Sequence, residues 1–308
     1  MNTMTSARGV SRRAFLVSSG RCLAGVAIGG ALATDGPLEP VIDIHQHTNY
    51  ADRTDEQLIR HQEMMGVTKT VLLPAGRFYG LDAKCGPNET VVELARRHPE
   101  KFAYFANEVA DIEEAPAVIK RFLRRGAIGI GEQKFRVGSD SHFIERIARV
   151  AEEFGVPILL HFQHAVYNTG IENFHKTLAK FPRVNFIGHA QTWWGNVDAK
   201  HDQKVLYPTG KVTPGGITDR FLADYPNMFG DHSAGSGLNF LTRDPDFAAG
   251  FLARHQDKLL FGSDCDDHLG RGPTCQGAQI LLNLRKLAAD KTVERKILYQ
   301  NARKLLKL

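Results

Sequence analysis

The sequence lacks the features that mark fibrous, repetitive and disulfide-stapled proteins. Its 308 residues include four cysteines and no low-complexity tract, heptad array or internal repeat of fixed period. Coiled-coil and solenoid architectures are therefore excluded, and so is a disulfide framework. Cys22 lies in the N-terminal segment, which leaves at most one internal disulfide, and a Cys265–Cys275 bridge stays open. We interpret Cys265, next to Asp264, as a small packing residue rather than a metal ligand.

A long run of basic residues is also missing. The formal net charge is +5, but Arg8, Arg12, Arg13 and Arg21 all fall within residues 1–33, which contain no acidic residue. Removing these four from the 39 basic residues leaves 35, against 34 acidic residues, a formal charge near +1. A nearly neutral chain without a basic cluster is not expected to bind nucleic acid.

The N-terminal segment has the composition of an export signal. The motif SRRAFL at 11–16 precedes a mildly apolar stretch, rich in Gly and Ala, that ends in ALA at 31–33. This order resembles a twin-arginine export signal, which implies the twin-arginine export machinery as a partner and a periplasmic or extracellular location. A membrane anchor needs about 20 strongly apolar residues, and Arg21 interrupts this stretch, so we expect no stable membrane anchor.

We predict an export signal at 1–33 and a single folded domain at 34–308. The domain contains eight short apolar runs, at 41–45, 69–75, 102–108, 127–132, 157–162, 184–190, 227–233 and 258–264. Helical patterns occur at 54–65, 88–98, 113–125, 141–155, 171–181, 245–255, 276–289 and 291–306, and a long excursion occupies 191–220. We expect Asn88 to cap the start of its helix and Gly155 to end its helix.

Near-continuous apolar runs separated by helices predict a parallel sheet covered on both faces. Eight such strand–helix units predict an α/β fold of the (β/α)8 TIM-barrel class. The alternative is a doubly wound open sheet, which needs a glycine-rich phosphate loop after an early strand. The segment PAGRFYG at 74–80 is not such a loop.

Polar side chains gather where the apolar runs end. The candidate site residues lie at or beside the ends of five of the runs, and they are His45, His47, Glu132, His161, His189 and Asp264. Because barrels build active sites at the carboxyl ends of their strands, we expect these side chains to converge. Burying four imidazoles and two carboxylates together is costly unless a cation organises them. Imidazole and carboxylate ligands suit a divalent metal, Zn²⁺ above others, with Mn²⁺ also compatible.

The same strand ends carry a family resemblance. VIDIHQH, GIGE, ILLHFQH, NFIGHA and LLFGSD resemble the strand signatures of the metal-dependent amidohydrolase superfamily. The similarity is greatest to the amidohydrolase-related branch, which includes lactonases and aminocarboxymuconate-semialdehyde decarboxylase-like enzymes. It spans residues 41–308.

The resemblance implies a role for each position. His45, His47 and Asp264 look like ligands of a first metal ion, joined by His161 in one-metal relatives, where His189 is a non-ligating acid or electrophile. In two-metal relatives the equivalents of His161 and His189 hold the second ion, and a carboxylate on the fourth strand bridges both. Glu132 matches that bridge, and Lys134 is the alternative, because a modified lysine bridges the metals in some relatives. One or two ions are therefore expected.

Two reactions are compatible with such a site. The first is hydrolysis of a lactone, ester or amide of a small carboxylate-containing substrate by metal-activated water, with Asp264 as general acid–base and the metal or His189 polarising the carbonyl. The alternative is metal-dependent non-oxidative decarboxylation, which the motifs do not separate from hydrolysis. A metal-binding protein without turnover is the third interpretation. Asp264 argues against it, because four protein ligands usually close a structural zinc site.

Residues that contact the substrate are less well defined. Arg77 and Tyr79 follow the second strand and either bind a carboxylate or lie in a solvated loop. Trp193 and Trp194 either wall the pocket or pack in the core. The oligomeric state is open, and a homo-oligomer is compatible with the sequence. Further polar residues near strand ends are His164, Asp231, His232 and His268.

Overall fold

The computed structural model describes residues 39–76 and 85–308. The predicted export signal at 1–33 and the loop residues Arg77 and Tyr79 lie outside these ranges.

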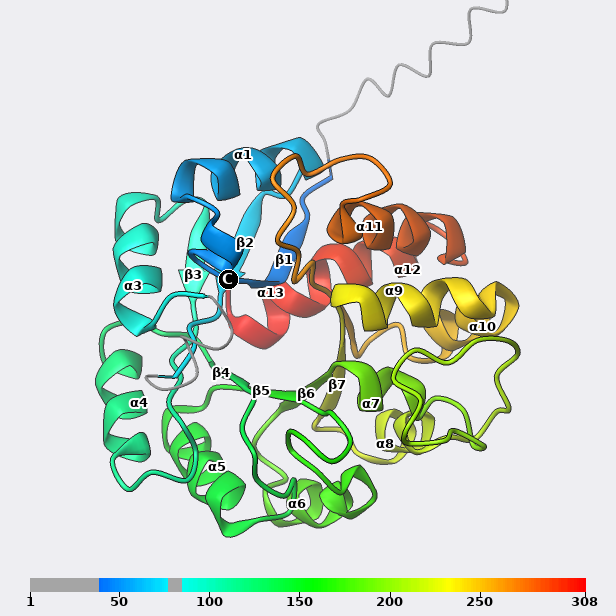
Figure 1. Ribbon diagram of the computed structural model, residues 1–308, viewed down its shortest axis with the longest axis horizontal. Coiled ribbons are helices and arrows are strands. Elements are labelled where there is room, and N and C mark those ends of the chain that lie inside the picture. The colour runs from blue at the N-terminus through cyan, green and yellow to red at the C-terminus, as the bar shows by residue number, and fades with distance from the viewer. Residues whose placement is uncertain (1–38, 77–84) are drawn as a thin grey trace, which may run out of the picture. The chain divides into compact units, whose positions relative to one another are not determined.

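Parallel strands form the centre of the described chain (Figure 1). They are β1 (Ile42–Gln46), β2 (Lys69–Leu72), β3 (Phe102–Tyr104), β4 (Ile130–Gln133), β5 (Ile158–His161), β6 (Phe186–His189), β7 (Met228–His232) and β8 (Leu259–Phe261). Neighbours pair in chain order from β1 to β3 and from β4 to β8. A parallel bridge between Ala106 and Ile130 continues β3 into β4. The Asp264 amide donates to the His45 carbonyl oxygen (2.8 Å), which joins the end of β8 to β1. The predicted (β/α)8 barrel is confirmed.

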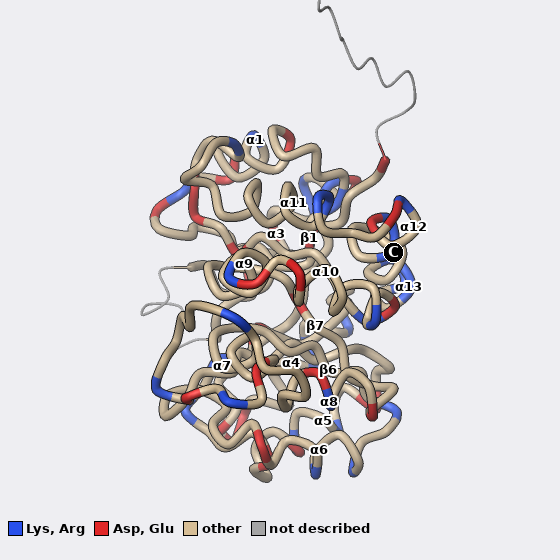
Figure 2. Tube along the Cα trace, turned by 90° about the vertical axis from the view of Figure 1, so that its right-hand side faces the viewer, with Lys and Arg blue, Asp and Glu red and all other residues tan. Residues whose placement is uncertain are grey.

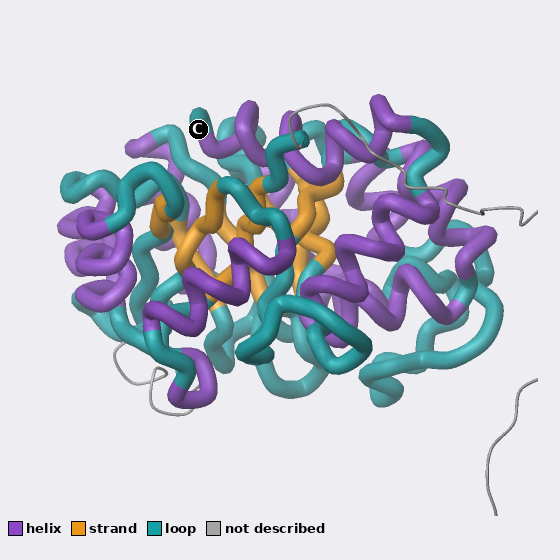
Figure 3. The backbone as a smooth tube through the Cα atoms, turned by 90° about the horizontal axis from the view of Figure 1, so that it is seen from above, coloured by secondary structure: helices purple, strands orange, loops and turns teal. Residues whose placement is uncertain are grey.

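Helices surround the strands (Figure 3). They are α1 (Asp55–Met65), α3 (Asn88–Arg97), α4 (Ala115–Leu123), α5 (His142–Phe154), α6 (Phe174–Lys180), α7 (Gln191–Gly195), α8 (Ile217–Asp224), α9 (Ala234–Arg243), α10 (Pro245–Arg254), α11 (Gln276–Leu287), α12 (Lys291–Arg295) and α13 (Asn301–Leu306). Shorter turns are η1 (Tyr50–Asp52), η2 (Ile171–Asn173) and the π-helical η3 (Lys296–Gln300). In the ranges that the structure describes, no helix is both long and apolar enough to cross a membrane. Basic and acidic residues are interspersed along the helices in Figure 2, in keeping with the nearly balanced charge beyond residue 33.

The helix ends show where local sequence signals succeed and where they fail. α5 begins after the N-cap Ser141 and ends at Gly155, whose φ of 65° is left-handed, as predicted. The prediction for Asn88 is wrong, because Pro87 is the N-cap of α3. Asn88 instead donates from its side chain to the Asn107 carbonyl oxygen (2.7 Å) and accepts a bond from the Asn107 amide (3.0 Å). Its side chain thus ties α3 to the segment after β3.

The excursion at 191–220 contains α7 and the start of α8, and α9 follows β7 directly.

Apolar side chains fill the barrel below its carboxyl end. Residues from the strands and their immediate continuations pack with Ala302 and Leu306 of α13, and the set is Ile42, Ile44, Val71, Leu73, Phe105, Leu159, Ile187 and Leu260. Most of these residues precede the polar strand ends in the chain, so α13 covers the amino end of the barrel. The carboxyl end remains available for a site.

An aromatic cluster packs outside β6 and β7. Trp193 is fully buried and stacks on Phe162, with ring centroids 6.0 Å apart. Trp194 stacks on Phe240 (4.6 Å) and also contacts the ring of His232 (4.3 Å). Both tryptophans therefore pack in the core, as one of the two interpretations of the sequence predicted, and do not wall the pocket. Burial disfavours the imidazolium form and lowers the pKa of His232 to about 3.

This buried imidazole predicts a specific loss of stability in acid. Below about pH 6.5 the unfolded chain binds a proton at His232 that the folded chain does not bind. The resulting loss of folding free energy is absent above that pH and grows as the pH falls towards 3. The free energy of unfolding of the wild type should therefore fall faster than that of His232→Asn, by up to about 1.4 kcal/mol per pH unit between pH 6 and pH 4. Urea titrations at several pH values measure this difference. Parallel curves for the two proteins would contradict it.

Candidate metal centre

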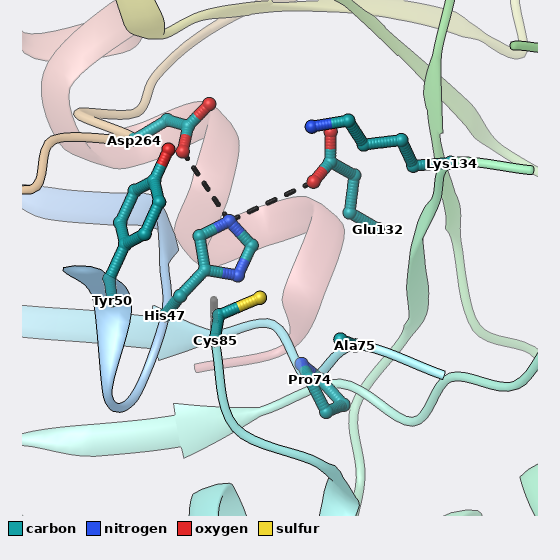
Figure 4. Close-up of a pocket in the computed structure, with 8 residues that line it drawn as sticks. All are labelled: His47, Tyr50, Pro74, Ala75, Cys85, Glu132, Lys134 and Asp264. Carbon is teal, nitrogen blue, oxygen red and sulfur yellow. Dashed lines mark ion pairs between the residues drawn. The ribbon is translucent and has the colours of Figure 1, made fainter. Parts of the chain in front are cut away.

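The structure brings all six predicted site residues together at the carboxyl end of the barrel. Glu132, on β4, lies at the centre of the group. His47 lies between it and Asp264, with its Nε2 3.7 Å from Glu132 Oε2 and 3.4 Å from Asp264 Oδ1 (Figure 4). His45 Nε2 lies 3.7 Å from Glu132 Oε2 and 3.9 Å from Asp264 Oδ2. His189 Nε2 lies 3.6 Å from Glu132 Oε1 and 3.5 Å from Asp264 Oδ2.

Each oxygen of the Glu132 carboxylate faces a different pair of histidines. Oε2 faces His45 and His47 at 3.7 Å each. Oε1 lies 2.5 Å from His161 Nδ1 and 3.6 Å from His189 Nε2. The donor atoms form two neighbouring groups, one from His45, His47 and Asp264 and the other from Glu132, His161 and His189. The Glu132 carboxylate belongs to the second group and also faces the two histidines of the first.

Outer partners orient three of the four imidazoles. His45 Nδ1 contacts Asp231 Oδ2 (2.7 Å), and His47 Nδ1 contacts the Leu73 carbonyl oxygen (2.7 Å). His189 Nδ1 contacts Ser233 Oγ (2.7 Å). A hydrogen bond on Nδ1 leaves Nε2 directed at the cluster, which is the usual arrangement for histidines that ligate a metal.

Several of the converging atoms have no hydrogen-bond partner. His45 Nε2, His189 Nε2 and Asp264 Oδ1 are buried and have none among the described residues. An unpartnered buried polar atom carries a desolvation cost of about 1–3 kcal/mol, so such atoms rarely occur together without a reason. A cation bound among them would satisfy all three. The donor set of imidazole nitrogen and carboxylate oxygen fits a divalent metal.

The electrostatics of the cluster also favour a cation. Burial opposes ionisation of Asp264, but the neighbouring His45 and His47 outweigh it and hold the pKa of that carboxyl well below its usual range. Burial likewise opposes charge on Glu132, and Lys134 and His161 outweigh it, so its pKa is also far below the usual range. Both carboxylates are therefore ionised in an interior where isolated negative charge is costly.

The four histidines form two pairs, one with raised and the other with lowered pKa values. Burial opposes protonation of His47, but Cys85 and Asp264 raise its pKa to about 10. Asp264 and Asp231 likewise outweigh burial and raise the pKa of His45. Burial instead prevails at His161 and His189 and lowers both pKa values. A metal ion at the first pair must displace protons, so metal affinity should rise with pH.

Local backbone features allow the strands to bring these groups close. The pairing of β1 with β2 shifts register between Asp43 and Gln46. Such a bulge re-aims side chains, and here Ile44 lies in the barrel interior while the next residue, His45, still reaches the cluster. Directly after β8, a Cβ at Gly262 would lie 2.3 Å from an oxygen of Asp231, so only glycine permits this approach. Asp264 has a φ of 41°, a strained conformation that is concentrated at functional sites.

A cavity opens above the cluster. Its two lobes share Tyr50, Lys134 and Asp264 as lining residues. The ammonium group of Lys134 lies beside the Glu132 carboxylate, and the hydroxyl of Tyr50 lies beside Asp264 (Figure 4). Burial lowers the pKa of Lys134, but Glu132 and Asp264 more than compensate and raise it, so the side chain is a cation at neutral pH. The cavity therefore offers a positive charge next to the cluster.

Other residues near strand ends have different positions. Asp231 is fully buried behind His45 rather than in the cavity, and His232 lies in the aromatic cluster. His164 lines a separate, outer cavity, and His268 is exposed. Ser233 and Tyr50 were not among the residues predicted from the sequence. Asp231 and Ser233 do repeat the spacing of His45 and His47, two residues apart at a strand end, and that signal was available.

Removal of the charge behind His45 should weaken metal binding without removing a ligand. Asp231→Asn keeps an acceptor for His45 Nδ1 but loses the carboxylate, so the metal affinity of the barrel mouth should fall about 10–100-fold. Competition with a chromophoric chelator measures the affinity. The matched control is Asp219→Asn, which alters a different carboxylate–histidine pair, Asp219–His255 (2.6 Å), and should leave the affinity unchanged. Equal affinities in the two variants would contradict the role of Asp231.

Three solved structures share this fold at low sequence identity. One is an uncharacterised TIM-barrel protein from Bordetella bronchiseptica, with a TM-score of 0.65 and 16% identity over 87% of this chain and 98% of that one. Another is a probable 2-pyrone-4,6-dicarboxylic acid hydrolase from Acinetobacter baumannii, with a TM-score of 0.57 and 15% identity over 87% and 99% of the two chains. The third is a 5-carboxyvanillate decarboxylase from Sphingomonas paucimobilis, with a TM-score of 0.54 and 13% identity over 88% and 99%.

No curated protein matches the sequence. The sequence profile of the amidohydrolase family Amidohydro_2, in contrast, matches residues 42–308. The match begins in β1 and includes all eight strands and all six residues of the cluster. The resemblance seen in the strand motifs is confirmed, and the chain belongs to the amidohydrolase family.

Proposed function

We propose that the protein is a metal-dependent hydrolase that adds water to a lactone, ester or amide of a small carboxylate-containing substrate. The observation that carries this proposal is the geometry of Glu132, whose Oε2 faces His45 and His47 and whose Oε1 faces His161 and His189. A carboxylate between two groups of imidazoles is suited to bridge two ions. Two-ion sites serve hydrolytic displacement, in which both the attacking and the leaving oxygen need stabilisation.

The residues divide naturally between two ions. His45, His47 and Asp264 would hold the first, His161 and His189 the second, and Glu132 both. Bound there, divalent ions such as Zn²⁺ or Mn²⁺ supply Lewis acidity, which polarises a carbonyl and lowers the pKa of water towards neutrality. The choice of Zn²⁺ rests on the histidine-rich donor set.

Asp264 is the general acid–base of the proposed reaction. Its carboxylate is ionised and lines both lobes of the cavity, and its Oδ1 has no hydrogen-bond partner among the described residues. It can therefore orient the attacking water and accept its proton. The same proton then passes to the leaving oxygen or nitrogen, which completes the cleavage with no net proton transfer. His189, also predicted as catalytic, would act in the two-ion arrangement as a ligand whose neutral Nε2 faces the site.

The cationic Lys134 is the reason for proposing a substrate that contains a carboxylate. The cationic side chain lines both lobes next to the cluster, where it can pair with an anionic group of a bound molecule. Two of the fold relatives support this class, because the names of their substrates, 2-pyrone-4,6-dicarboxylic acid and 5-carboxyvanillate, denote carboxylates. Tyr50 provides a polar hydroxyl on the same wall.

Non-oxidative decarboxylation is the second candidate. The observation in its favour is the 2.5 Å contact between His161 Nδ1 and Glu132 Oε1, which pairs these residues with each other. In that arrangement a single ion at His45, His47 and Asp264 would leave His189 outside the set of metal ligands, where its neutral imidazole could polarise a substrate oxygen. The reaction would then release carbon dioxide from the substrate carboxylate, and a proton from water would take its place on the substrate carbon.

The products separate the two reactions. With a panel of small carboxylate-bearing lactones and esters in isotopically labelled water, each turnover of a hydrolase places one labelled oxygen in the product acid. Asp264→Asn should lower kcat on the substrates that react by about 10²–10⁴-fold, because it removes the general base. Asp219→Asn is the control for a general effect of losing a partly buried, histidine-paired carboxylate. Release of carbon dioxide without label in the product would contradict hydrolysis.

Lys134 should affect binding of the substrate anion. Lys134→Met should raise KM for carboxylate-bearing substrates about 10–100-fold, because one charge-assisted contact is worth about 1.5–3 kcal/mol. The methyl ester of the same substrate is the matched control, since it lacks the anion and should show a similar KM with either enzyme. Steady-state kinetics test the point. Equal increases in KM for the acid and its ester would show that Lys134 does not recognise the carboxylate.

A further inference from the structure

A second group of ligand-type side chains lies apart from the barrel mouth. It consists of His61 on α1, Cys265 just after β8, and Cys275 at the start of α11, and the three donor atoms lie within 4.8 Å of one another. All three residues are buried. Helices α1 and α11 are neighbours in Figure 1, with the 266–274 loop running between them. The cluster therefore joins α1 to two neighbouring segments near the C-terminal end of the chain, the end of β8 and the start of α11.

The separations match those of a tetrahedral metal site. The two Sγ atoms lie 3.7 Å apart, and Cys275 Sγ lies 3.4 Å from His61 Nε2. With bonds of about 2.3 Å to sulfur and 2.0–2.1 Å to nitrogen, tetrahedral coordination of Zn²⁺ places two sulfurs about 3.8 Å apart and a sulfur and a nitrogen about 3.6 Å apart. A disulfide would instead need the sulfurs about 2.05 Å apart, and both thiols are free.

The histidine is held in the form that a metal requires. His61 Nδ1 lies 2.9 Å from Gln62 Oε1. Gln62 donates from its Nε2 to Asp43 (2.8 Å) and Thr70 (2.8 Å), which identifies Oε1 as the acceptor end of the amide. Nδ1 of His61 is therefore the donor nitrogen, and Nε2 presents its lone pair to the thiols. This is the outer partner expected behind a metal-ligating imidazole.

The charge of the two thiolates and their softness as ligands indicate which ion binds. Two thiolates with a divalent cation form a neutral unit, which suits a buried position, whereas a monovalent cation would leave a net negative charge there. Thiolate ligands favour Zn²⁺ over hard ions such as Mg²⁺ or Ca²⁺. Met65, one turn after His61 on α1, belongs to the same buried apolar cluster as both cysteines.

We propose that His61, Cys265 and Cys275 bind one thiophilic divalent ion of the Zn²⁺ type, separate from the ions of the barrel mouth. This assigns Cys265 a ligand role in place of the packing role that the sequence indicated. The ion would fasten the end of β8 to α1 and α11. Because Cys265 directly follows Asp264, the ion acts as a structural clamp beside the proposed general base. The inference does not depend on the proposed function.

Cobalt substitution tests the site directly. The full chain is freed of metal, loaded with Co²⁺ under reducing, oxygen-free conditions, and its near-ultraviolet spectrum is recorded. The site predicts a thiolate-to-cobalt charge-transfer band that is lost in Cys275→Ser. Serine at this position can keep the N-cap that the Cys275 sulfur provides to the Ala278 amide (3.4 Å), so the helix should survive the change. Metal analysis after loading with Zn²⁺ should show one equivalent fewer per chain in Cys275→Ser.

Two controls separate this site from the barrel mouth. Cys85→Ser should retain the band, since Cys85 lines the cavity at the mouth rather than this cluster. Glu132→Gln should lose metal from the mouth and retain the band. Absence of the band in both the wild type and Cys85→Ser, with Cys265 and Cys275 reacting as free thiols in excess metal, would overturn the proposal. A chain mass lower by two hydrogens would show a disulfide instead and would overturn it equally.

Discussion

Negative charge buried at the carboxyl end of the barrel determines how the strand ends are arranged. Glu132, Asp264 and Asp231 lie within a few ångströms of four imidazoles, and Asp231 is fully enclosed. Transfer of even one uncompensated carboxylate from water into such an interior costs several kcal/mol. The raised pKa values of His45 and His47 show that the cluster draws in positive charge, and a divalent cation meets that demand with two charges at once. The apolar core beneath the cluster holds these charged side chains close together. The apolar layer between the strands and α13 fixes the strands that carry the ligands.

Coupled contacts extend the cluster outward from its centre. Ser233 Oγ donates to Asp231 Oδ2 (2.8 Å) and also contacts the rings of His189 (2.7 Å) and His45 (3.3 Å), so one hydroxyl links two ligands. Asp43 accepts bonds from the amides of His45 (3.0 Å) and Ser263 (2.9 Å), which joins β1 to β8 directly beneath the site. Through Gln62, Asp43 is also connected to His61 of the thiol cluster. The two clusters thus share one hydrogen-bonded framework, although their ligands differ in chemical softness.

Much of this arrangement could be predicted from the sequence, because it follows from strand periodicity and from the direction of parallel strands. Eight apolar runs with helices between them identified the barrel, and polar residues at five run ends identified the cluster. The outer partners were harder to predict, since Asp231 lies in β7 and Ser233 directly after it, without a histidine pair of the kind that marks β1. Tertiary packing decided other positions. The pairing of Asn88 with Asn107 could not be seen in local capping rules, and the aromatic cluster that buries Trp193 and Trp194 forms only when α9 and α10 are placed. The contact of His61 with Cys275 joins residues 214 positions apart, so no local pattern could reveal it.

We infer from this geometry that Glu132 bridges two ions at the barrel mouth. Crystals of the protein loaded with Zn²⁺ and measured at the zinc absorption edge test it most directly. If Glu132 is the bridge, two anomalous peaks should lie about 3.5–4 Å apart, one on each side of its carboxylate. A single peak coordinated by His45, His47 and Asp264, with Glu132 hydrogen-bonded to His161 alone, would contradict it.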